Sequence, residues 1–209
     1  MTLLTFKTQI LPVIVITDVR QAVPMAHALL AGGIDAMEIT LRHAAGLAAI
    51  EAVARAVPEM HVGAGTVTRA DEVARVQAAG ATFALSPGYS PIVLQAARAL
   101  VLPFVPGVMT PSEVMTARDA GYTLLKLFPA VQAGGLGMLQ ALRGPLGDVQ
   151  FCPTGGVSQS NLKEFLSQPN VAMVGGSWLT PAHLVEVGRW DEITALARAA
   201  TDAAAEVAA

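Results

Sequence analysis

Residues 123–130, Thr-Leu-Leu-Lys-Leu-Phe-Pro-Ala, place a lysine inside an apolar run with the length and composition of a buried strand. The chain has only three lysines, and the other two, Lys7 and Lys163, lie in ordinary polar surroundings. An unpaired buried ammonium is very costly, so Lys126 needs a carboxylate partner, a solvated end or a chemical role. Because desolvation favours the neutral amine, which attacks carbonyl carbons, the segment predicts either a nucleophilic lysine or a structural ion pair.

Short apolar runs like this one alternate along the chain with alanine-rich segments of helical period. We predict strands at 11–16, 35–40, 60–66, 82–86, 103–106, 123–128, 149–153 and 171–175. We predict helices at 20–31, 44–57, 69–79, 90–100, 110–120, 135–143, 158–168 and 181–205, the last broken near Gly188. Eight such units predict an α/β fold, a (β/α)8 TIM barrel formed as one compact domain over residues 1–209. An open doubly wound sheet is the alternative, but no Gly-x-Gly-x-x-Gly turn follows the first strand.

Helix-end signals agree with this division of the chain. The segments 31–33, 78–80 and 119–121 each place a glycine where a helix C-cap is expected, just before a strand. Thr110-Pro111-Ser112-Glu113 is the pattern of a capping box with proline at the first helical position. Ser90-Pro91 and Thr180-Pro181 are expected to begin helices in the same way.

Composition excludes several classes of protein. Hydrophobic residues make up 53% of the 209 residues and charged residues only 14%, which favours strands buried on both faces. The longest apolar run, near 10–16, falls far short of a membrane span, and no export signal is evident. A net charge of −3, scattered arginines and 5% aromatics argue against nucleic-acid binding. The single cysteine, Cys152, fits a reducing cytoplasm, where we expect the protein.

Side-chain alternation predicts which strand residues point into the barrel. In the sixth strand Lys126 shares a face with Leu124 and Phe128, while the flanking leucines face the helices. In the second strand the same rule turns Glu38 inward. A carboxylate beside a lysine is either a structural ion pair or the minimum equipment for Schiff-base chemistry.

Small and polar residues gather after the strands, where such barrels keep their active sites. Gly155-Gly156 and Gly175-Gly176 follow the last two strands, a place where backbone N–H groups commonly hold phosphate in this fold. Arg42 directly follows the second strand and can bind a carboxylate through two hydrogen bonds. A tight turn for the glycines and a surface position for the arginine are the alternatives.

Six motifs occur in order between about residues 8 and 200: Glu-Ile-Thr-Leu-Arg at 38–42, Gly-Ala-Gly-Thr-Val at 63–67, Ser-Pro-Gly at 86–88, Leu-Lys-Leu-Phe-Pro-Ala at 125–130, Cys-Pro-Thr-Gly-Gly-Val at 152–157 and Gly-Gly-Ser-Trp at 175–178. This set resembles that of the KDPG/KHG aldolases, class I enzymes that act on 2-keto-3-deoxy-6-phosphogluconate and 4-hydroxy-2-oxoglutarate. Each motif is modest alone, and together they are specific. His43 departs from the pattern, since many members have threonine there.

The resemblance implies a role for each matched residue. It implies that Lys126 forms the Schiff base and that Glu38 is the general acid/base. It further implies contacts to the substrate, which fall into three groups: Arg42 and Thr66 at the carboxylate, Pro87, Phe128 and Thr154 as walls of the pocket, and Gly155, Gly156, Gly176 and Ser177 at the phosphate. Members of this family are typically homotrimers, and they use no cofactor and no metal, because a protonated imine replaces the Lewis acid.

The resemblance implies cleavage of 2-keto-3-deoxy-6-phosphogluconate to pyruvate and glyceraldehyde 3-phosphate. Arg42 favours this substrate over the phosphogalactonate, whose enzymes tend to lack that arginine. An aldolase for 4-hydroxy-2-oxoglutarate or for the phosphogalactonate stays as an alternative. So does a non-catalytic phosphosugar-binding barrel, which would have no use for Lys126 and Glu38 together. An isomerase or synthase barrel would likewise need no inward lysine.

Overall fold

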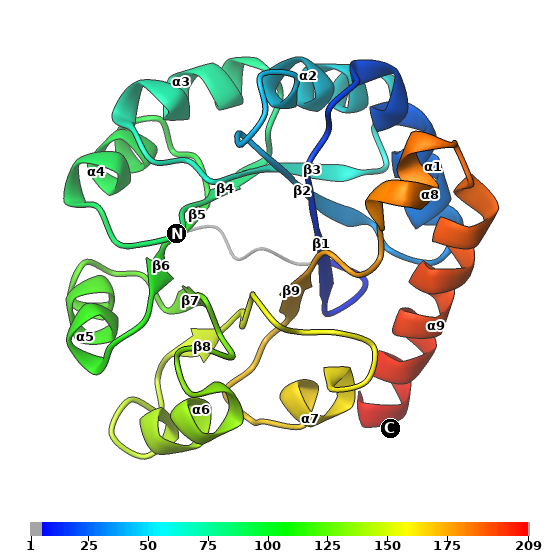
Figure 1. Cartoon of the computed structure of the whole chain (residues 1–209). Coiled ribbons are helices and arrows are strands. Elements are labelled where there is room, and N and C mark those ends of the chain that lie inside the picture. Colours follow the sequence, from blue (N-terminus) through cyan, green and yellow to red (C-terminus); the bar gives the residue numbers. More distant parts are fainter. Residues whose placement is uncertain (1–5, 209) are drawn as a thin grey trace.

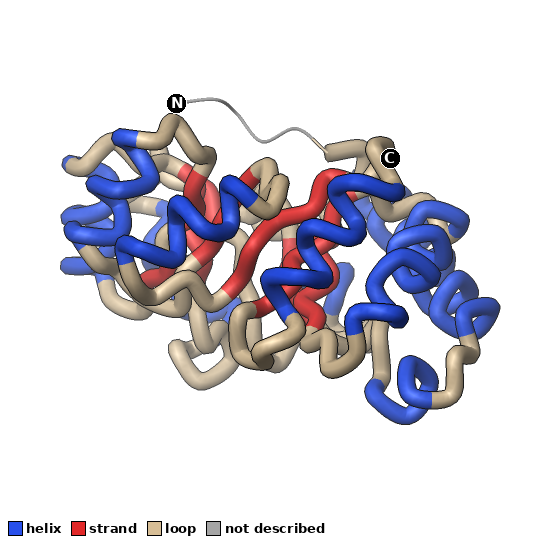
Figure 2. The backbone as a smooth tube through the Cα atoms, turned by 90° about the horizontal axis from the view of Figure 1, so that it is seen from above, coloured by secondary structure: helices blue, strands red, loops and turns tan. Residues whose placement is uncertain are grey.

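The computed structural model describes residues 6–208, in which parallel strands curl together and helices lie around them (Figure 1). A view turned by 90° shows the strands running between helices on either side (Figure 2). The strands are β1 (Ile10–Ile14), β2 (Ala36–Thr40), β3 (His61–Gly65), β4 (Phe83–Leu85), β5 (Phe104–Val105), β6 (Gly107–Val108), β7 (Leu124–Leu127), β8 (Gln150–Phe151) and β9 (Val174–Gly176).

The helices fall between the strands, as the sequence predicts. They are η1 (Val19–Gln21), α1 (Ala22–Ala31), α2 (Gly46–Ala56), α3 (Ala70–Ala78), α4 (Pro91–Ala99), α5 (Pro111–Asp119), α6 (Gly135–Arg143), α7 (Leu162–Leu166), α8 (Ala182–Glu186) and α9 (Trp190–Ala208). Within residues 6–208, no helix is both long and apolar enough to cross a membrane.

The strand pairing is parallel throughout the two sheets. One sheet has the order β5-β4-β3-β2-β1-β9 and the other the order β6-β7-β8. Residue 106, a proline without an N–H, separates β5 from β6, so the strand predicted at 103–106 stops at Val105 and a further strand, β6, follows the proline. Parallel bridges join Phe151 to Val171 and Thr154 to Gly175, on the side where β8 approaches β9. The α/β class and the curled parallel arrangement are therefore confirmed.

Most predicted helix ends are confirmed. Gly33, Gly80 and Gly121 have φ values of 92°, 93° and 82°, the left-handed conformation expected of glycine after a helix. Thr110 and Glu113 form the predicted capping box of α5. The expectation at residues 180–181 is wrong, because α8 begins at Ala182 and Pro181, not Thr180, is its N-cap.

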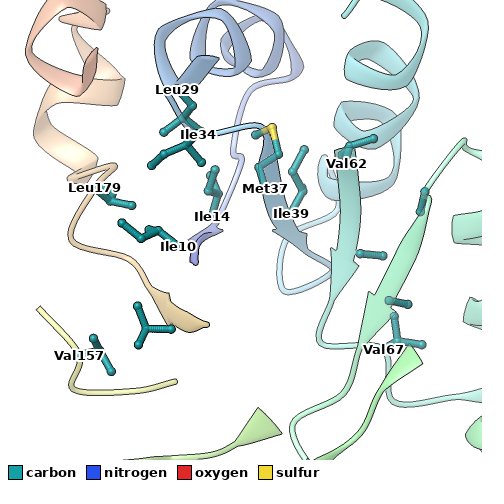
Figure 3. Close-up of a cluster of buried hydrophobic side chains, with 14 of the residues drawn as sticks. Ile10, Ile14, Leu29, Ile34, Met37, Ile39, Val62, Val67, Val157 and Leu179 are labelled. Carbon is teal, nitrogen blue, oxygen red and sulfur yellow. The ribbon is translucent and has the colours of Figure 1, made fainter. Parts of the chain in front are cut away.

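The two faces of the strands bury different side chains. Met37 and Ile39 of β2 and Ile14 of β1 belong to the large cluster between strands and helices, which also contains Leu29 of α1 (Figure 3). A smaller cluster lies on the opposite face of the strands, and its buried members are Leu11, Ala36, Phe83, Leu85, Val105, Cys152 and Met173. Leu125 and Leu127 join the large cluster and Leu124 packs against the small one, which confirms the predicted alternation in β7.

Candidate active site

Lys126 and Glu38 form a buried ion pair. The Lys126 Nζ donates to Glu38 Oε1 at 2.9 Å and to Oε2 at 3.2 Å. Glu38 is 0% exposed and Lys126 4% exposed, so water screens this pair little. Both side chains extend from the strand face that carries the small apolar cluster, as the alternation rule requires. The structure thus brings together the two residues that the sequence singles out.

The strands beside this pair are built from small residues. Glu38 lies opposite Gly63 of β3 in the strand register, and Lys126 lies opposite Gly107 of β6. A Cβ added at Gly107 would lie 2.3 Å from the carbonyl carbon of Pro87, so the glycine allows the loop after β4 to approach the strand closely. Pro87 is thereby held beside β6, although it is not part of the pocket wall described below.

A pocket of about 590 Å³ opens at the carboxyl ends of the strands. Seven of the predicted site residues line it, namely Arg42, Phe128, Thr154, Gly155, Gly156, Gly176 and Ser177. Lys126, Glu38, Thr66 and Pro87 are outside its wall. Phe128 connects the pocket to the ion pair, because its ring centroid lies 5.5 Å from the Lys126 Nζ. The Phe128 ring is therefore both part of the pocket wall and a neighbour of the lysine nitrogen.

Glycine backbone dominates one end of the pocket. Gly155 and Gly156 have φ values of 97° and 83°, a conformation that other residues rarely adopt. Within residues 6–208, the backbone N–H groups of Gly155, Gly156 and Ser177 donate to no protein acceptor. Unpaired N–H groups that converge on one pocket can bind an anion.

The charged residues at the pocket are exposed. Arg42 and Glu186 both lie on its wall and are in contact with solvent. Across residues 6–208, neither side chain takes part in an ion pair of the protein. Arg42 is thus free to meet a carboxylate in the pocket.

Thr66, at the carboxyl end of β3, has strained backbone. Its φ of 60° is left-handed, which is uncommon for a β-branched residue. Such strain costs on the order of 1–3 kcal/mol and gathers at functional sites. Thr66 is half-buried and lies next to Gly65, whose neighbour across the strands is Thr40.

His43 lies outside the pocket wall. Its ring Nδ1 accepts a hydrogen bond from the backbone N of Ala45 at 3.2 Å, and the side chain is exposed. The histidine therefore stabilises the turn that leads into α2.

Cys152 lies inside the curled sheet, within the small apolar cluster. Burial raises the pKa of its thiol from 9.0 to about 12, although the nearby Lys126 charge and a contact with Thr154 oppose this shift. The sulfur is 3.8 Å from the Thr154 hydroxyl oxygen. The thiol therefore stays protonated and acts as a small apolar group near the lysine.

The sequence pattern misses part of the pocket wall. Thr17 follows β1, and its place just beyond a strand is the signal that also indicates Thr66. Thr180, Pro181, Val185 and Glu186 line the pocket from the α8 region, where strand-end reasoning gives no signal. As for metals, no group of three or more His, Cys, Asp or Glu side chains in residues 6–208 is arranged to hold an ion.

Comparison with known proteins extends over nearly the whole chain. The family model for KDPG and KHG aldolase matches residues 3–196, which include Glu38 and Lys126. A protein of Pseudoalteromonas atlantica named 2-dehydro-3-deoxy-phosphogluconate aldolase is 50% identical over 198 residues, covering 95% of this chain and 92% of the relative. The KHG/KDPG aldolase of Escherichia coli K12 is 47% identical over 195 residues, covering 93% of this chain and 92% of the relative.

A solved structure shows the same likeness in three dimensions. It is the KDPG aldolase of Legionella pneumophila with pyruvate captured at low pH as a covalent carbinolamine intermediate. It matches with a TM-score of 0.91 at 42% identity, over 93% of this chain and 95% of its own.

Proposed function

The chain belongs to the KDPG and KHG aldolase family, and we propose that it is a class I aldolase that cleaves 2-keto-3-deoxy-6-phosphogluconate to pyruvate and glyceraldehyde 3-phosphate. The observation that carries this proposal is the Lys126–Glu38 pair, at 2.9 Å, beside a pocket whose wall includes Phe128. The relative from Pseudoalteromonas atlantica has the name of the same activity, and the Legionella structure contains the carbinolamine that such a reaction requires.

Lys126 is the proposed nucleophile. It passes a proton to Glu38, and the neutral amine attacks the C2 ketone of the substrate to form a carbinolamine. Glu38 returns that proton to the carbinolamine hydroxyl, which leaves as water, so Glu38 is again a carboxylate and a protonated imine is formed. This imine accepts the electron pair of the C3–C4 bond as that bond breaks. The C4 hydroxyl becomes the aldehyde of glyceraldehyde 3-phosphate, and pyruvate stays on Lys126 as an enamine.

Glu38 is the proposed acid/base. Directly or through a water, it takes the proton of the C4 hydroxyl during cleavage and returns a proton to C3 of the enamine. Hydrolysis of the resulting imine releases pyruvate and restores the amine. The position supports this role, since Glu38 is fully buried and Lys126 donates to both of its carboxylate oxygens.

The remaining site residues are proposed to bind the substrate. Arg42 and Thr66 hold its carboxylate, and Pro87, Phe128 and Thr154 shape the channel around its carbon chain. Gly155, Gly156, Gly176 and Ser177 hold the phosphate. The free N–H groups of Gly155, Gly156 and Ser177 support this last assignment, because a phosphate needs several donors at once.

A second candidate substrate is 4-hydroxy-2-oxoglutarate. The relative from Escherichia coli K12, at 47% identity, has a name that includes both activities. The same imine chemistry applies to this shorter, unphosphorylated molecule. Arg42 at the pocket favours the phosphogluconate over the phosphogalactonate, as the resemblance implies.

We further propose the complete (β/α)8 barrel as a single domain, a homotrimer in the cytoplasm, and work in the Entner–Doudoroff pathway. The bridges from Phe151 to Val171 and from Thr154 to Gly175, beside β8 and β9, support closure of the barrel. The Legionella enzyme, with a TM-score of 0.91 over 93% of this chain, supports one domain.

Reduction by borohydride in the presence of pyruvate, followed by peptide mass spectrometry, tests the proposal. We expect a pyruvate-derived adduct on Lys126 and none in Lys126→Ala, whose cleavage activity should fall by several orders of magnitude. The matched control is Lys163→Ala, because Lys163 pairs with a carboxylate, Glu206, on the surface. A wild-type protein that forms no adduct would instead be a phosphosugar-binding barrel, with Lys126 as a structural residue.

A further inference from the structure

Gly65 packs directly against the carboxylate of Glu38. It is the last residue of β3 and lies opposite Thr40 in the register between β2 and β3. A Cβ added at Gly65 would lie 2.0 Å from Glu38 Oε1 and 2.6 Å from both Cδ and Cγ, where ordinary contact begins at 3.4 Å. The carboxylate therefore occupies the space that a side chain at residue 65 would need.

The backbone at residue 65 does not by itself require glycine. Gly65 is in a strand and is not among the residues with positive φ, whereas the next residue, Thr66, has a φ of 60° without being glycine. Glycine is thus not required at residue 65 for its conformational freedom. It is required because a side chain there would overlap with Glu38.

Few other contacts fix the carboxylate. Within residues 6–208, Lys126 is the only residue that donates hydrogen bonds to Glu38, and this is the bond that must break when the amine attacks a substrate. Packing against β3 then has to hold the carboxylate in place. A shift of about 1 Å in such a group can lower a rate about 100-fold.

We propose that Gly65 is a positioning residue for the acid/base step. Because Gly65 has no side chain, the Glu38 carboxylate can lie against the backbone of β3, and this packing holds it in place. This inference rests on the proposed function, in which Glu38 carries the proton. A larger residue at 65 displaces the carboxylate from the enamine carbon, while Lys126 still reaches the ketone.

Gly63 provides a matched control on the same strand. It lies two residues earlier and therefore on the same face of β3. A Cβ added there would lie 2.2 Å from the Phe83 ring, and its three nearest atoms all belong to that ring. Alanine at 63 thus causes a comparable steric clash, in which Phe83 and not the Glu38 carboxylate is the first contact.

The test introduces Gly65→Ala and Gly63→Ala separately into the wild-type protein and into Glu38→Ala. Three quantities are measured on each full chain: deuterium exchange at the methyl group of pyruvate, the fraction of Lys126 that borohydride traps on pyruvate, and the thermal midpoint. Exchange rates are divided by the trapped fraction, so that only competent sites are counted.

With Glu38 present, we expect Gly65→Ala to lower exchange about 100-fold while trapping persists. In the Glu38→Ala background, Gly65→Ala should lower exchange no further and should cost less thermal stability, since the clash is gone. Gly63→Ala should lower the thermal midpoint equally in both backgrounds and leave exchange per trapped site unchanged. If Gly65→Ala does not fold, recovery of folding in Glu38→Ala/Gly65→Ala supports the steric relationship.

Unchanged exchange in Gly65→Ala, an equal loss of stability in both backgrounds, or failure of both Gly65 variants to fold would overturn the role of Gly65. These outcomes leave the proposed function intact when the wild-type protein traps pyruvate and exchanges its protons. A wild-type protein that does neither overturns the proposed function, and the positioning role with it.

Discussion

Glu38 and Lys126 are 88 residues apart in sequence and lie on β2 and β7, strands that do not pair with each other, yet their charged groups are 2.9 Å apart. The contact exists because the strands curl so that one face of each points inward. Two ionisable groups that are buried on separate strands are thereby brought within hydrogen-bond distance of each other. The chemistry thus depends on the curvature of the sheet.

Glu38→Gln should separate imine formation from proton transfer. Glutamine keeps the size of the side chain and a carbonyl oxygen for Lys126, but it cannot act as a base at neutral pH. We expect borohydride still to trap pyruvate on Lys126, and the exchange of pyruvate methyl protons to slow by about 10²–10⁴-fold. Proton exchange is followed by NMR in deuterium oxide.

Glu206→Gln is the control for this change. Glu206 pairs with Lys163 on the surface, so the same chemical change occurs at a residue outside the pocket wall. It should leave trapping and exchange at wild-type values. Normal exchange in Glu38→Gln would assign the proton transfer to another group.

Ser177→Ala should weaken binding of the phosphorylated substrate more than that of 4-hydroxy-2-oxoglutarate. The substitution keeps the backbone N–H of Ser177 and removes its hydroxyl. A hydrogen bond from that hydroxyl to a charged group contributes about 1.5–3 kcal/mol, so KM for the phosphorylated substrate should rise by about 10- to 100-fold. KM for the unphosphorylated substrate should change little. Steady-state kinetics on both substrates measures the difference.

Ser160→Ala is the matched control, because Ser160 is exposed and, among the residues that the structure describes, its hydroxyl bonds only to the Ser158 hydroxyl. It should leave both KM values unchanged. An equal rise of both KM values in Ser177→Ala would remove the Ser177 hydroxyl from the phosphate site.

Thr66 and Val101 differ in why they adopt positive φ. Val101 has a φ of 55°, is 79% exposed and follows the C-cap of α4, so Val101→Gly should stabilise the protein by about 1 kcal/mol. Thr66→Gly relieves similar strain, so its free energy of unfolding should either stay within about 1 kcal/mol of the wild-type value or increase. Urea unfolding measures both free energies.

Activity distinguishes the two substitutions. Val101→Gly should leave turnover unchanged, and Thr66→Gly should lower it because Thr66 is proposed to contact the substrate carboxylate. A large loss of stability in Thr66→Gly would show that its left-handed backbone is not strained.

Cys152 should make the folded state less stable at high pH. Burial raises the pKa of this thiol to about 12 from an ordinary value of 9.0, so the unfolded chain loses the proton first. Stability from this group is complete below pH 9 and falls as the pH rises from 9 towards 12. The free energy of unfolding of the wild type should therefore decline more steeply over this range than that of Cys152→Ala.

Alkylation provides a direct check. Iodoacetamide should fail to label native Cys152, which is fully buried and protonated, and should label it in urea. Rapid labelling of the native protein at pH 8 would contradict the raised pKa.

Strand alternation predicts much of the site from sequence, because side chains alternate wherever a strand is regular. It turns Glu38 and Lys126 to the same side as Ala36 and Leu124, and the structure confirms both. It is less accurate where the backbone departs from regular geometry. The strand predicted at 103–106 stops before residue 106, and Thr180 does not cap α8. Proline's missing N–H breaks the ladder at the first of these places.

The sequence by itself determined the order of strands and helices, the glycine turns that end helices, and the inward direction of Glu38 and Lys126. All of these depend on local periodicity and on backbone preferences of single residues. Only the tertiary structure decided that the Lys126 Nζ lies 2.9 Å from Glu38 Oε1 and that Gly65 leaves room for this carboxylate. It also decided that Thr17 and Glu186 complete the pocket wall. These relationships depend on how strands and loops distant in sequence pack together, and local sequence patterns do not encode such distances.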